Sequence, residues 1–217
     1  MENSATPEAV VLAYQGVRSR TIEILRSLDD QQAELIVPAC PEWTIRDLAC
    51  HLYGVIADLF AGRLEGAGSD QWTAAQVELH KDWTLAQLCD AWEQSAAQFD
   101  ELLLAIPAPV NLRIVMDQVT HEHDLRHALG RFGAQSSEAI AMGTTWLVQS
   151  LGGGDPKLAA LLATTEARPF EIFRALGGRR SVRQLNELGF SGQAFADQLA
   201  GSPISVPEED FIEAVAD

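Results

Sequence analysis

The chain has 217 residues, with 15 Lys and Arg against 31 Asp and Glu, so its formal net charge is −16 at pH 7. Hydrophobic residues make up 47% and charged residues 21%, which is ordinary for a globular protein and excludes a disordered acidic chain. The acidic excess excludes general binding to nucleic acid or to anionic lipid, because both require clustered Lys and Arg. We therefore expect neither a nucleic-acid nor a membrane partner.

The first residues and the cysteines bear on where the protein resides. Residues 1–8 are acidic and polar, without the basic start and apolar run of a secretory signal. No stretch approaches the roughly 18 consecutive apolar residues of a membrane-spanning helix. The three cysteines, Cys40, Cys50 and Cys89, contain no CxxC pair, so neither a disulfide scaffold nor a cysteine zinc site is expected. These features predict a protein of the reducing cytoplasm.

Capping residues mark where the first helices begin. Thr6, followed by a proline and an acid, predicts a first helix whose apolar face repeats every three or four residues. Residues 35–41 contain two prolines and are expected to form a connection. Thr44 and Asp47 have the spacing of a capping box, which predicts a second helix that runs to about residue 64. Thr84 predicts a third helix, which ends at the prolines after residue 106.

The next two helices complete a bundle. A fourth helix is predicted from about Asn111 to Leu129, where Gly130 suits a C-terminal cap. A fifth begins near Ser136 or Ser137 and stops at the three glycines 152–154. Four long amphipathic segments and one further helix favour a helix bundle, so the predicted fold class is mainly α.

The character of the sequence changes after the three glycines. Residues 169–176 and 181–188 are predicted to be helical, whereas residues 158–165 fit either a helix or a short strand. The tail carries four acids, which we expect to be solvated like most other acids of the chain: Glu208, Glu209, Asp210 and Glu213. The predicted organisation is a bundle over residues 1–152 and a short, mostly helical extension over residues 153–217.

The fourth predicted helix holds the densest group of histidines. At roughly 100° per residue, Asp117 and His121 lie about 40° apart on one face, and Asp124 lies about 60° from His121. His123 and His127 point away from His121, by about 160° and 120°. Asp117 and His121 are therefore a candidate pair of metal ligands, with Asp124 placed to hydrogen-bond a ligand.

A third candidate ligand lies on the second predicted helix. His51 follows Asp47 by four residues and has apolar neighbours, so it is expected to face inward, with Asp47 behind it. Two neutral imidazoles and a carboxylate suit Zn²⁺, Ni²⁺ or Fe²⁺ and leave positions open for water or substrate. The alternative is a hydrogen-bonded core histidine, because the spacing of Asp117 and His121 is common by chance.

Two segments resemble a known family. The segment Pro41-Glu42-Trp43-Thr44-Ile45-Arg46-Asp47-Leu48-Ala49-Cys50-His51-Leu52 resembles the W-[ST]-x-x-D-L-x-x-H-L segment of DinB-like bundles, specifically of the actinobacterial mycothiol-dependent maleylpyruvate isomerase family. The segment from Asp117 through His121 and Asp124 to Gly130 is similar to that family's E-x-x-x-H-x-x-D stretch. A weaker likeness covers residues 171–181, where related chains carry an E-x-x-R…G-R-R-S segment in a C-terminal extension.

The resemblance implies a DinB-like four-helix bundle in which His51, Asp117 and His121 hold a divalent metal, with Zn²⁺ first and Ni²⁺ or Fe²⁺ as alternatives. In such enzymes the open metal positions take the thiolate of a low-molecular-weight thiol, here mycothiol. Addition of the thiol to an electrophilic substrate, rotation and elimination give cis–trans isomerisation, and transfer of the thiol gives an S-transferase. Related bundles are monomers or homodimers. Neither route needs a protein thiol, so Cys50 is expected to be core.

The chain departs from the family pattern in ways that leave a second hypothesis open. Asp117 stands where the family has Glu, and its shorter reach requires closer helices, an intervening water or a weaker site. The C-terminal part is also short. The alternative function is a non-catalytic bundle that binds metal or associates through its surface. Arg179 and Arg180, after a glycine pair, fit either a carboxylate-binding site or a solvated basic turn, and Trp43 is expected to pack where its helix begins.

Overall fold

The computed structural model describes residues 5–152, 156–200 and 204–217. This part of the chain forms twelve helices and one two-stranded sheet, which confirms the mainly α fold class. The first elements are α1 (Pro7–Arg26), α2 (Asp30–Ala33), β1 (Ile36–Val37), β2 (Cys40–Thr44), α3 (Ile45–Ala61), α4 (Asp70–His80), α5 (Leu85–Gln94), α6 (Ala96–Ala105) and α7 (Val110–Leu129). The elements that follow are α8 (Glu138–Gly152), α9 (Pro156–Thr164), α10 (Pro169–Leu176), α11 (Val182–Glu187) and α12 (Gly192–Leu199).

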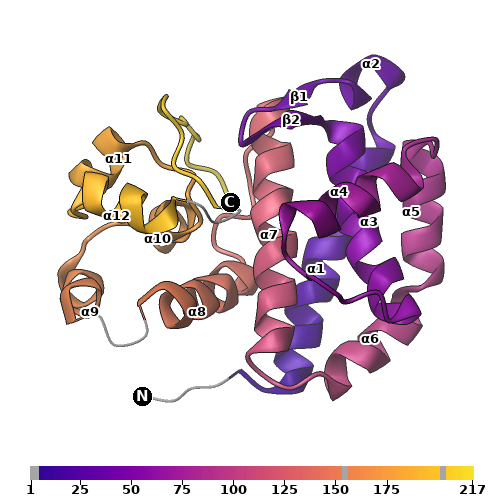
Figure 1. Ribbon diagram of the computed structural model, residues 1–217, viewed down its shortest axis with the longest axis horizontal. Coiled ribbons are helices and arrows are strands. Elements are labelled where there is room, and N and C mark those ends of the chain that lie inside the picture. Colours follow the sequence, from indigo (N-terminus) through magenta and orange to yellow (C-terminus); the bar gives the residue numbers. More distant parts are fainter. Residues whose placement is uncertain (1–4, 153–155, 201–203) are drawn as a thin grey trace.

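Four columns of helix form the bundle, namely α1, α3, α7 and the pair α5–α6 (Figure 1). The third predicted helix is thus two helices, because α5 ends at Gln94 with Ser95 as its C-cap. The Ser95 hydroxyl donates to the carbonyl of Trp92 at 3.0 Å, a side-chain bond that competes with continuation of the helix. Both pieces still pack against α1, so the break bends the column without removing it from the bundle.

Aromatic side chains from three helices join two of these columns in the core. Trp92 of α5 donates from its indole Nε1 to the hydroxyl of Tyr14 on α1 at 3.1 Å. The Tyr14 ring lies 4.9 Å from the ring of Phe99 on α6, and all three side chains are buried. Large aromatic rings with a satisfied polar atom give a core much of its burial energy, so this cluster holds α1 against the α5–α6 pair.

The capping signals of the sequence are confirmed. At the start of α1, α3 and α5, a threonine hydroxyl accepts a hydrogen bond from a backbone N–H group of the first turn. These residues are Thr6, Thr44 and Thr84, respectively. Gly130 ends α7 in the left-handed conformation with φ 62°. Gly62 does the same for α3 with φ 68°, so that helix ends a little before the predicted residue 64.

The sequence predicted neither α4 nor the β1–β2 hairpin. Helix α4 has a mostly polar sequence, yet it packs against α3 and buries Gln76 and His80. The hairpin replaces the expected connection before α3, and β1 contacts α7. Both elements are fixed by contacts with distant helices, and such contacts leave little local pattern.

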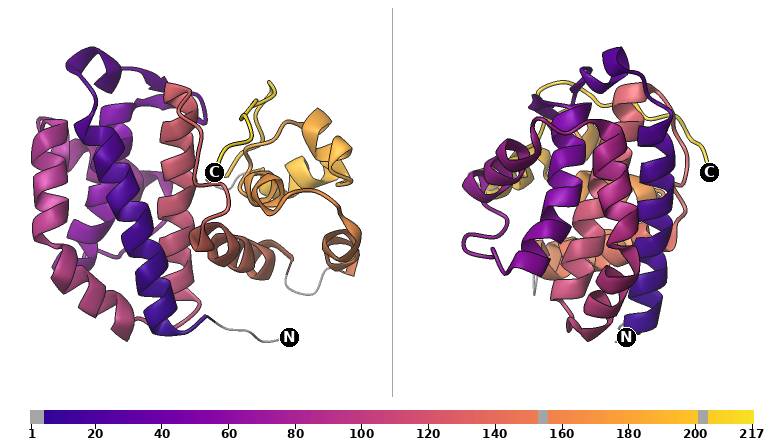
Figure 2. Two further views of the ribbon diagram at one scale, coloured as in Figure 1. Left: turned by 180° about the vertical axis from the view of Figure 1, so that it is seen from behind. Right: turned by 90° about the vertical axis from the view of Figure 1, so that its right-hand side faces the viewer.

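The C-terminal helices lie on the α7 side of the bundle (Figures 1 and 2). Residues 156–164 are helical, so the segment that fitted either a helix or a short strand is a helix. The extension is mostly helical, as predicted. Helix α8 contacts both α7 of the bundle and α10 of the extension. These contacts do not separate two domains at residue 152, so the domain boundary at that residue stays a prediction. Some residues named in the sequence predictions lie outside the described part of the chain. They are residues 1–4, the second and third of the three glycines (153 and 154), and Pro203 of the tail.

The described part of the tail, residues 204–217, contains neither helix nor strand and returns toward α7 (Figure 1). Its Glu213 is buried, so the expectation that the tail acids are all solvated is wrong. Among the described helices, none combines the length and the apolar character that a membrane crossing requires.

Candidate metal centre

Side chains from α3 and α7 converge at the three positions that the sequence singled out. His51 comes from α3, and Asp117 and His121 come from α7. The His51 Nε2 lies 3.6 Å from Asp117 Oδ2, and the His121 Nε2 lies 3.9 Å from Asp117 Oδ1. One nitrogen or oxygen from each of the three side chains lies within 4.8 Å of the other two. The helical spacing on α7 and the packing of α3 beside it therefore produce one cluster.

The cluster is enclosed, and its charges support one another. His51 and His121 are 2% and 8% exposed, whereas the Asp117 side chain is 31% exposed. Burial alone would raise the pKa of Asp117, but the adjacent His51 and His121 lower it below its ordinary value. Burial alone would lower the pKa of His51, but the Asp117 carboxylate raises it above its ordinary value. The carboxylate is thus held in the charged form that a metal ion requires.

The geometry of the three side chains suits a small divalent cation. Asp117 Oδ2 is buried without a hydrogen-bond partner, although buried polar atoms are nearly always paired. Two ligand atoms about 2.1 Å from a tetrahedral Zn²⁺ lie roughly 3.4 Å apart. The His51 Nε2 lies 3.6 Å from Oδ2 and the His121 Nε2 lies 3.9 Å from the other oxygen, Oδ1, so both separations are only slightly longer than this value. The short Asp117 thus lies within 4 Å of both imidazoles, His121 one turn further along α7 and His51 on the neighbouring α3.

Asp124 holds His121 from the side away from the cluster. Its Oδ2 lies 3.1 Å from the His121 Nδ1, which leaves the His121 Nε2 directed at Asp117. Two buried arginines also bind Asp124, with Arg174 Nη1 at 2.9 Å from Oδ1 and Arg179 Nη2 at 2.7 Å from Oδ2. Burial would raise the pKa of Asp124, but these arginines hold it well below its ordinary value. Asp124 therefore joins the cluster to the C-terminal extension.

Asp47 acts as the capping-box residue that the sequence predicted, and the structure shows it bound to Thr44 rather than to His51. Its Oδ2 accepts hydrogen bonds from the backbone and the hydroxyl of Thr44, as a capping box does. The outer nitrogen of His51, Nδ1, lies instead 2.7 Å from the side-chain oxygen of Gln76 on α4. Sequence reasoning missed Gln76 because it did not predict α4, and an isolated glutamine carries no signal of such a role.

Arg179 and Arg180 are buried, at 7% and 2% exposure, so the expectation of a solvated basic turn is wrong. The carboxylates that they bind belong to the protein itself. Arg179 binds Asp124, whereas Arg180 binds Glu171 at 2.9 Å and Glu213 at 2.7 Å. A third buried arginine, Arg174, binds both Asp124 and Glu213. These three buried arginines thus form one ion-pair network that includes Asp124.

An aromatic ring and a thiol border the cluster. The ring of Trp43 lies 5.2 Å from the His51 ring and 5.9 Å from the His121 ring, so the residue packs against the site as well as against the start of α3. The Cys40 sulfur lies near His121 and Asp124, but burial raises its pKa to about 12, which keeps it protonated. Cys50 is a buried core residue, as expected, and its thiol donates to the carbonyl of His80.

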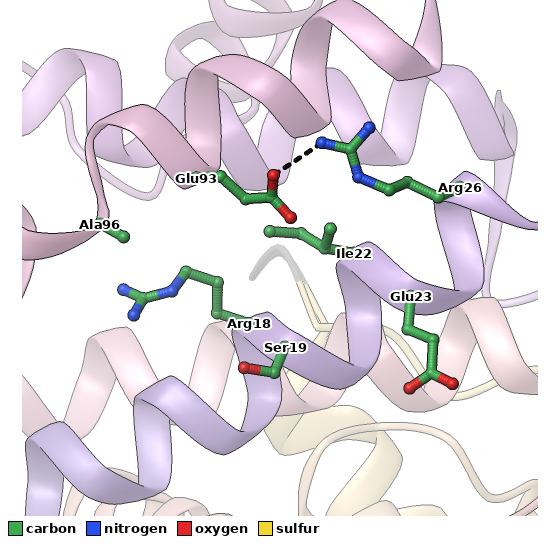
Figure 3. A pocket seen from close by; sticks show the side chains of 7 residues that line it. All are labelled: Arg18, Ser19, Ile22, Glu23, Arg26, Glu93 and Ala96. Atoms are coloured by element: carbon green, nitrogen blue, oxygen red, sulfur yellow. Dashed lines mark hydrogen bonds and ion pairs between the residues drawn. The ribbon is translucent and has the colours of Figure 1, made fainter.

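A separate surface hollow lies between α1 and the helices α5 and α6 (Figure 3). Charged side chains line it, and Arg26 crosses it to bind Glu93 at 2.7 Å. None of the three clustered side chains lines this hollow. Its exposed ion pairs belong to the outer face of the bundle, and they contribute little to stability.

Comparison with known proteins places the chain in a family. The sequence profile described as the mycothiol maleylpyruvate isomerase N-terminal domain matches residues 15–131, which is 117 of the 217 residues. No curated protein and no solved structure matches the chain. The matched segment contains both ligand-bearing motifs, all of α2 to α7 and the C-terminal part of α1, so the chain belongs to the family of the mycothiol maleylpyruvate isomerase N-terminal domain.

Proposed function

We propose that this protein is a metal-dependent enzyme that uses a low-molecular-weight thiol, as an isomerase or an S-transferase acting on an electrophilic substrate. Family membership supports the thiol, for which mycothiol is the first candidate. The observation that carries the proposal is the buried Asp117 Oδ2, which has no hydrogen-bond partner and lies 3.6 Å from the His51 Nε2, while the other carboxylate oxygen lies 3.9 Å from the His121 Nε2. A bound cation would supply the partner that this oxygen lacks.

In this proposal each residue of the cluster has a defined task. His51 and His121 offer Nε2 and Asp117 offers Oδ2, while Asp124 holds the ring of His121 in place. A bound divalent metal supplies the means to lower the pKa of a thiol so that it is available as a thiolate. Two neutral imidazoles and one carboxylate leave positive charge uncompensated on a divalent ion, which favours an anionic sulfur. Trp43 packs against both imidazole rings.

The proposal is tested with purified protein that carries no histidine tag. Reconstitution with Co²⁺ is expected to give the visible absorption of a low-coordinate site, and addition of mycothiol is expected to add a sulfur-to-cobalt band. His121→Ala is expected to abolish both signals, whereas His80→Ala serves as a control because His80 lies outside the cluster. Metal binding without any response to the thiol would refute the thiol-dependent activity.

A second candidate function is a non-catalytic bundle that binds metal or associates through its surface. The buried arginines favour it, because Arg174, Arg179 and Arg180 all bind carboxylates of the protein rather than facing outward toward an acidic substrate. A thermal shift with Zn²⁺ and no further shift with thiol supports this candidate, because only ligands of the native state raise the melting temperature. Sedimentation would then show whether the protein is a monomer or a homodimer.

A further inference from the structure

The outer nitrogen of His51 has a partner whose orientation can be deduced. Gln76 is 1% exposed, and its Oε1 lies 2.7 Å from His51 Nδ1. Its amide nitrogen donates to the carboxylate of Asp58 at 2.8 Å. A carboxylate only accepts, so the Gln76 amide nitrogen must face Asp58 and its oxygen must face His51. An amide oxygen also only accepts, so the proton of the neutral His51 ring resides on Nδ1.

The hydrogen-bond chain continues to the surface. Asp58 is 5% exposed, and its other oxygen accepts from the Nε of Arg63 at 2.6 Å. The Arg63 side chain is 50% exposed. With one oxygen of Asp58 bound to the guanidinium, the other oxygen is the acceptor that faces the amide of Gln76. The series Arg63–Asp58–Gln76–His51 thus sets one protonation pattern from the surface to the cluster.

The contact between Gln76 and His51 depends on Gly54 of α3. His51, Gly54 and Asp58 follow one another by three and four residues, so they share the face of α3 that meets α4. A Cβ on Gly54 would lie 2.6 Å from the Cβ of Gln76, which is closer than two carbon atoms can pack. The missing side chain lets α4 approach until Gln76 reaches the imidazole.

We infer that Gln76 is a positioning residue of the candidate metal centre, which holds His51 in the tautomer whose Nε2 lone pair faces Asp117 and is free to bind a metal. Without Gln76, the neutral ring can carry its proton on Nε2 and donate it to Asp117, whose Oδ2 is 3.6 Å away. That tautomer removes the ligand atom from the site. The tautomer part of the inference stands on the apo protein alone, and the metal part rests on the proposed function.

The test measures the tautomer and the metal affinity separately. Histidine ¹⁵N chemical shifts of the apo protein at about pH 9, where an imidazole is neutral, report which nitrogen of His51 carries the proton. Zn²⁺ titration with a competing chelator reports the affinity. Gln76→Met removes the acceptor at similar volume, and Gln71→Met on the exposed face of α4 is the matched control. Asp58→Leu removes the anchor of the amide, and Asp58→Asn retains an acceptor for it.

Wild type, Gln71→Met and Asp58→Asn are expected to carry the proton on Nδ1. Gln76→Met and Asp58→Leu are expected to move it to Nε2 and to weaken Zn²⁺ binding by about 10–100-fold, the usual effect of losing a partner of a metal ligand. Persistence of the Nδ1 proton in Gln76→Met, or Zn²⁺ affinity equal to that of Gln71→Met, overturns the inference. If Gln76→Met does not fold, the Asp58 pair decides. If even wild type binds no Zn²⁺, the proposed function fails, and the tautomer measurement still decides whether Gln76 orients His51.

Discussion

Single residues of this protein show what a sequence reveals about a site. The alignment of Asp117, His121 and Asp124 follows from helical spacing alone, so their placement on one side of α7 was predictable. The support of His51 was not, because Gln76 comes from a helix with no clear apolar face. Burial of Arg179 and Arg180 was also hidden, because two arginines after two glycines look like an exposed turn until their carboxylate partners are known.

A histidine outside the cluster allows a prediction on acid stability. The His127 ring lies 4.9 Å from the ring of Phe211, and its Nδ1 is buried without a partner. Burial lowers the pKa of His127 below its ordinary value despite the nearby Glu213. Below about pH 6.5 the unfolded chain therefore binds more protons than the native protein, and native stability falls as the pH decreases.

His127→Gln removes this uptake of protons. Urea unfolding between about pH 7 and pH 5 is expected to show a shallower decrease of the unfolding free energy than in wild type. The slope with pH is the quantity to compare, because the substitution also changes packing at every pH. Equal slopes for the two proteins would show that His127 takes up its proton in the native state as readily as in the unfolded chain.

At the scale of elements, the ends of helices were easier to predict than the contacts between them. The capping box of Thr44 and Asp47 at the start of α3 and the C-cap Gly130 of α7 act on neighbouring backbone groups. Their effect can therefore be predicted from the local sequence. Helix α4 owes its place to the close approach at Gly54, which depends on two segments more than twenty positions apart. The break at Ser95 was missed because the apolar face continues through it from Trp92 to Phe99.

Gly54→Ala tests the approach of α4 to α3. Alanine is favoured over glycine within a helix by about 1 kcal/mol, but overpacking a core costs about 1–3 kcal/mol. With a Cβ at 2.6 Å from that of Gln76, the packing cost is expected to exceed the gain, so both the unfolding free energy and the Zn²⁺ affinity should decrease. Denaturant unfolding and the chelator titration measure the two effects.

The control is Gly16→Ala on α1, where the added Cβ meets only the far end of the Arg20 side chain, at 3.1 Å. The contact is with Nη1, whereas Arg20 binds Glu122 through Nε and Nη2, so a small adjustment is enough; the helical preference for alanine should dominate, and stability should stay equal or increase. If Gly54→Ala behaves like Gly16→Ala, α4 does not depend on the missing side chain of Gly54.

At the scale of the whole molecule, the bundle and the extension are joined by buried charges. Glu213 of the tail binds Arg174 at 3.0 Å and Arg180 at 2.7 Å, and Arg174 in turn binds Asp124 beside His121. A helical bundle and a helical extension were predictable from sequence periodicity. Their connection was not, because an acidic tail in a chain of net charge −16 gives no sign that one of its carboxylates is internal.

Glu213→Ala is expected to destabilise the whole protein. Removing one partner of a buried ion pair leaves the other charge uncompensated, at a cost of about 3–5 kcal/mol. In a chain of this size, that loss should lower the melting temperature by roughly 6–20 °C. Glu209→Ala, at an exposed position of the same tail, should change stability by less than about 0.5 kcal/mol. Similar melting temperatures for both variants would contradict a structural role for the tail.

The claim on which the account depends is that Asp117, His51 and His121 form one metal site. The most direct measurement is the Zn²⁺ dissociation constant of the untagged protein and of Asp117→Asn, which keeps the size of the side chain and removes its charge. We expect wild type to bind one equivalent of Zn²⁺, and Asp117→Asn to bind more weakly by at least the 10–100-fold that loss of an outer hydrogen-bond partner costs. Equal affinities for the two proteins, or no binding to wild type, would contradict the account.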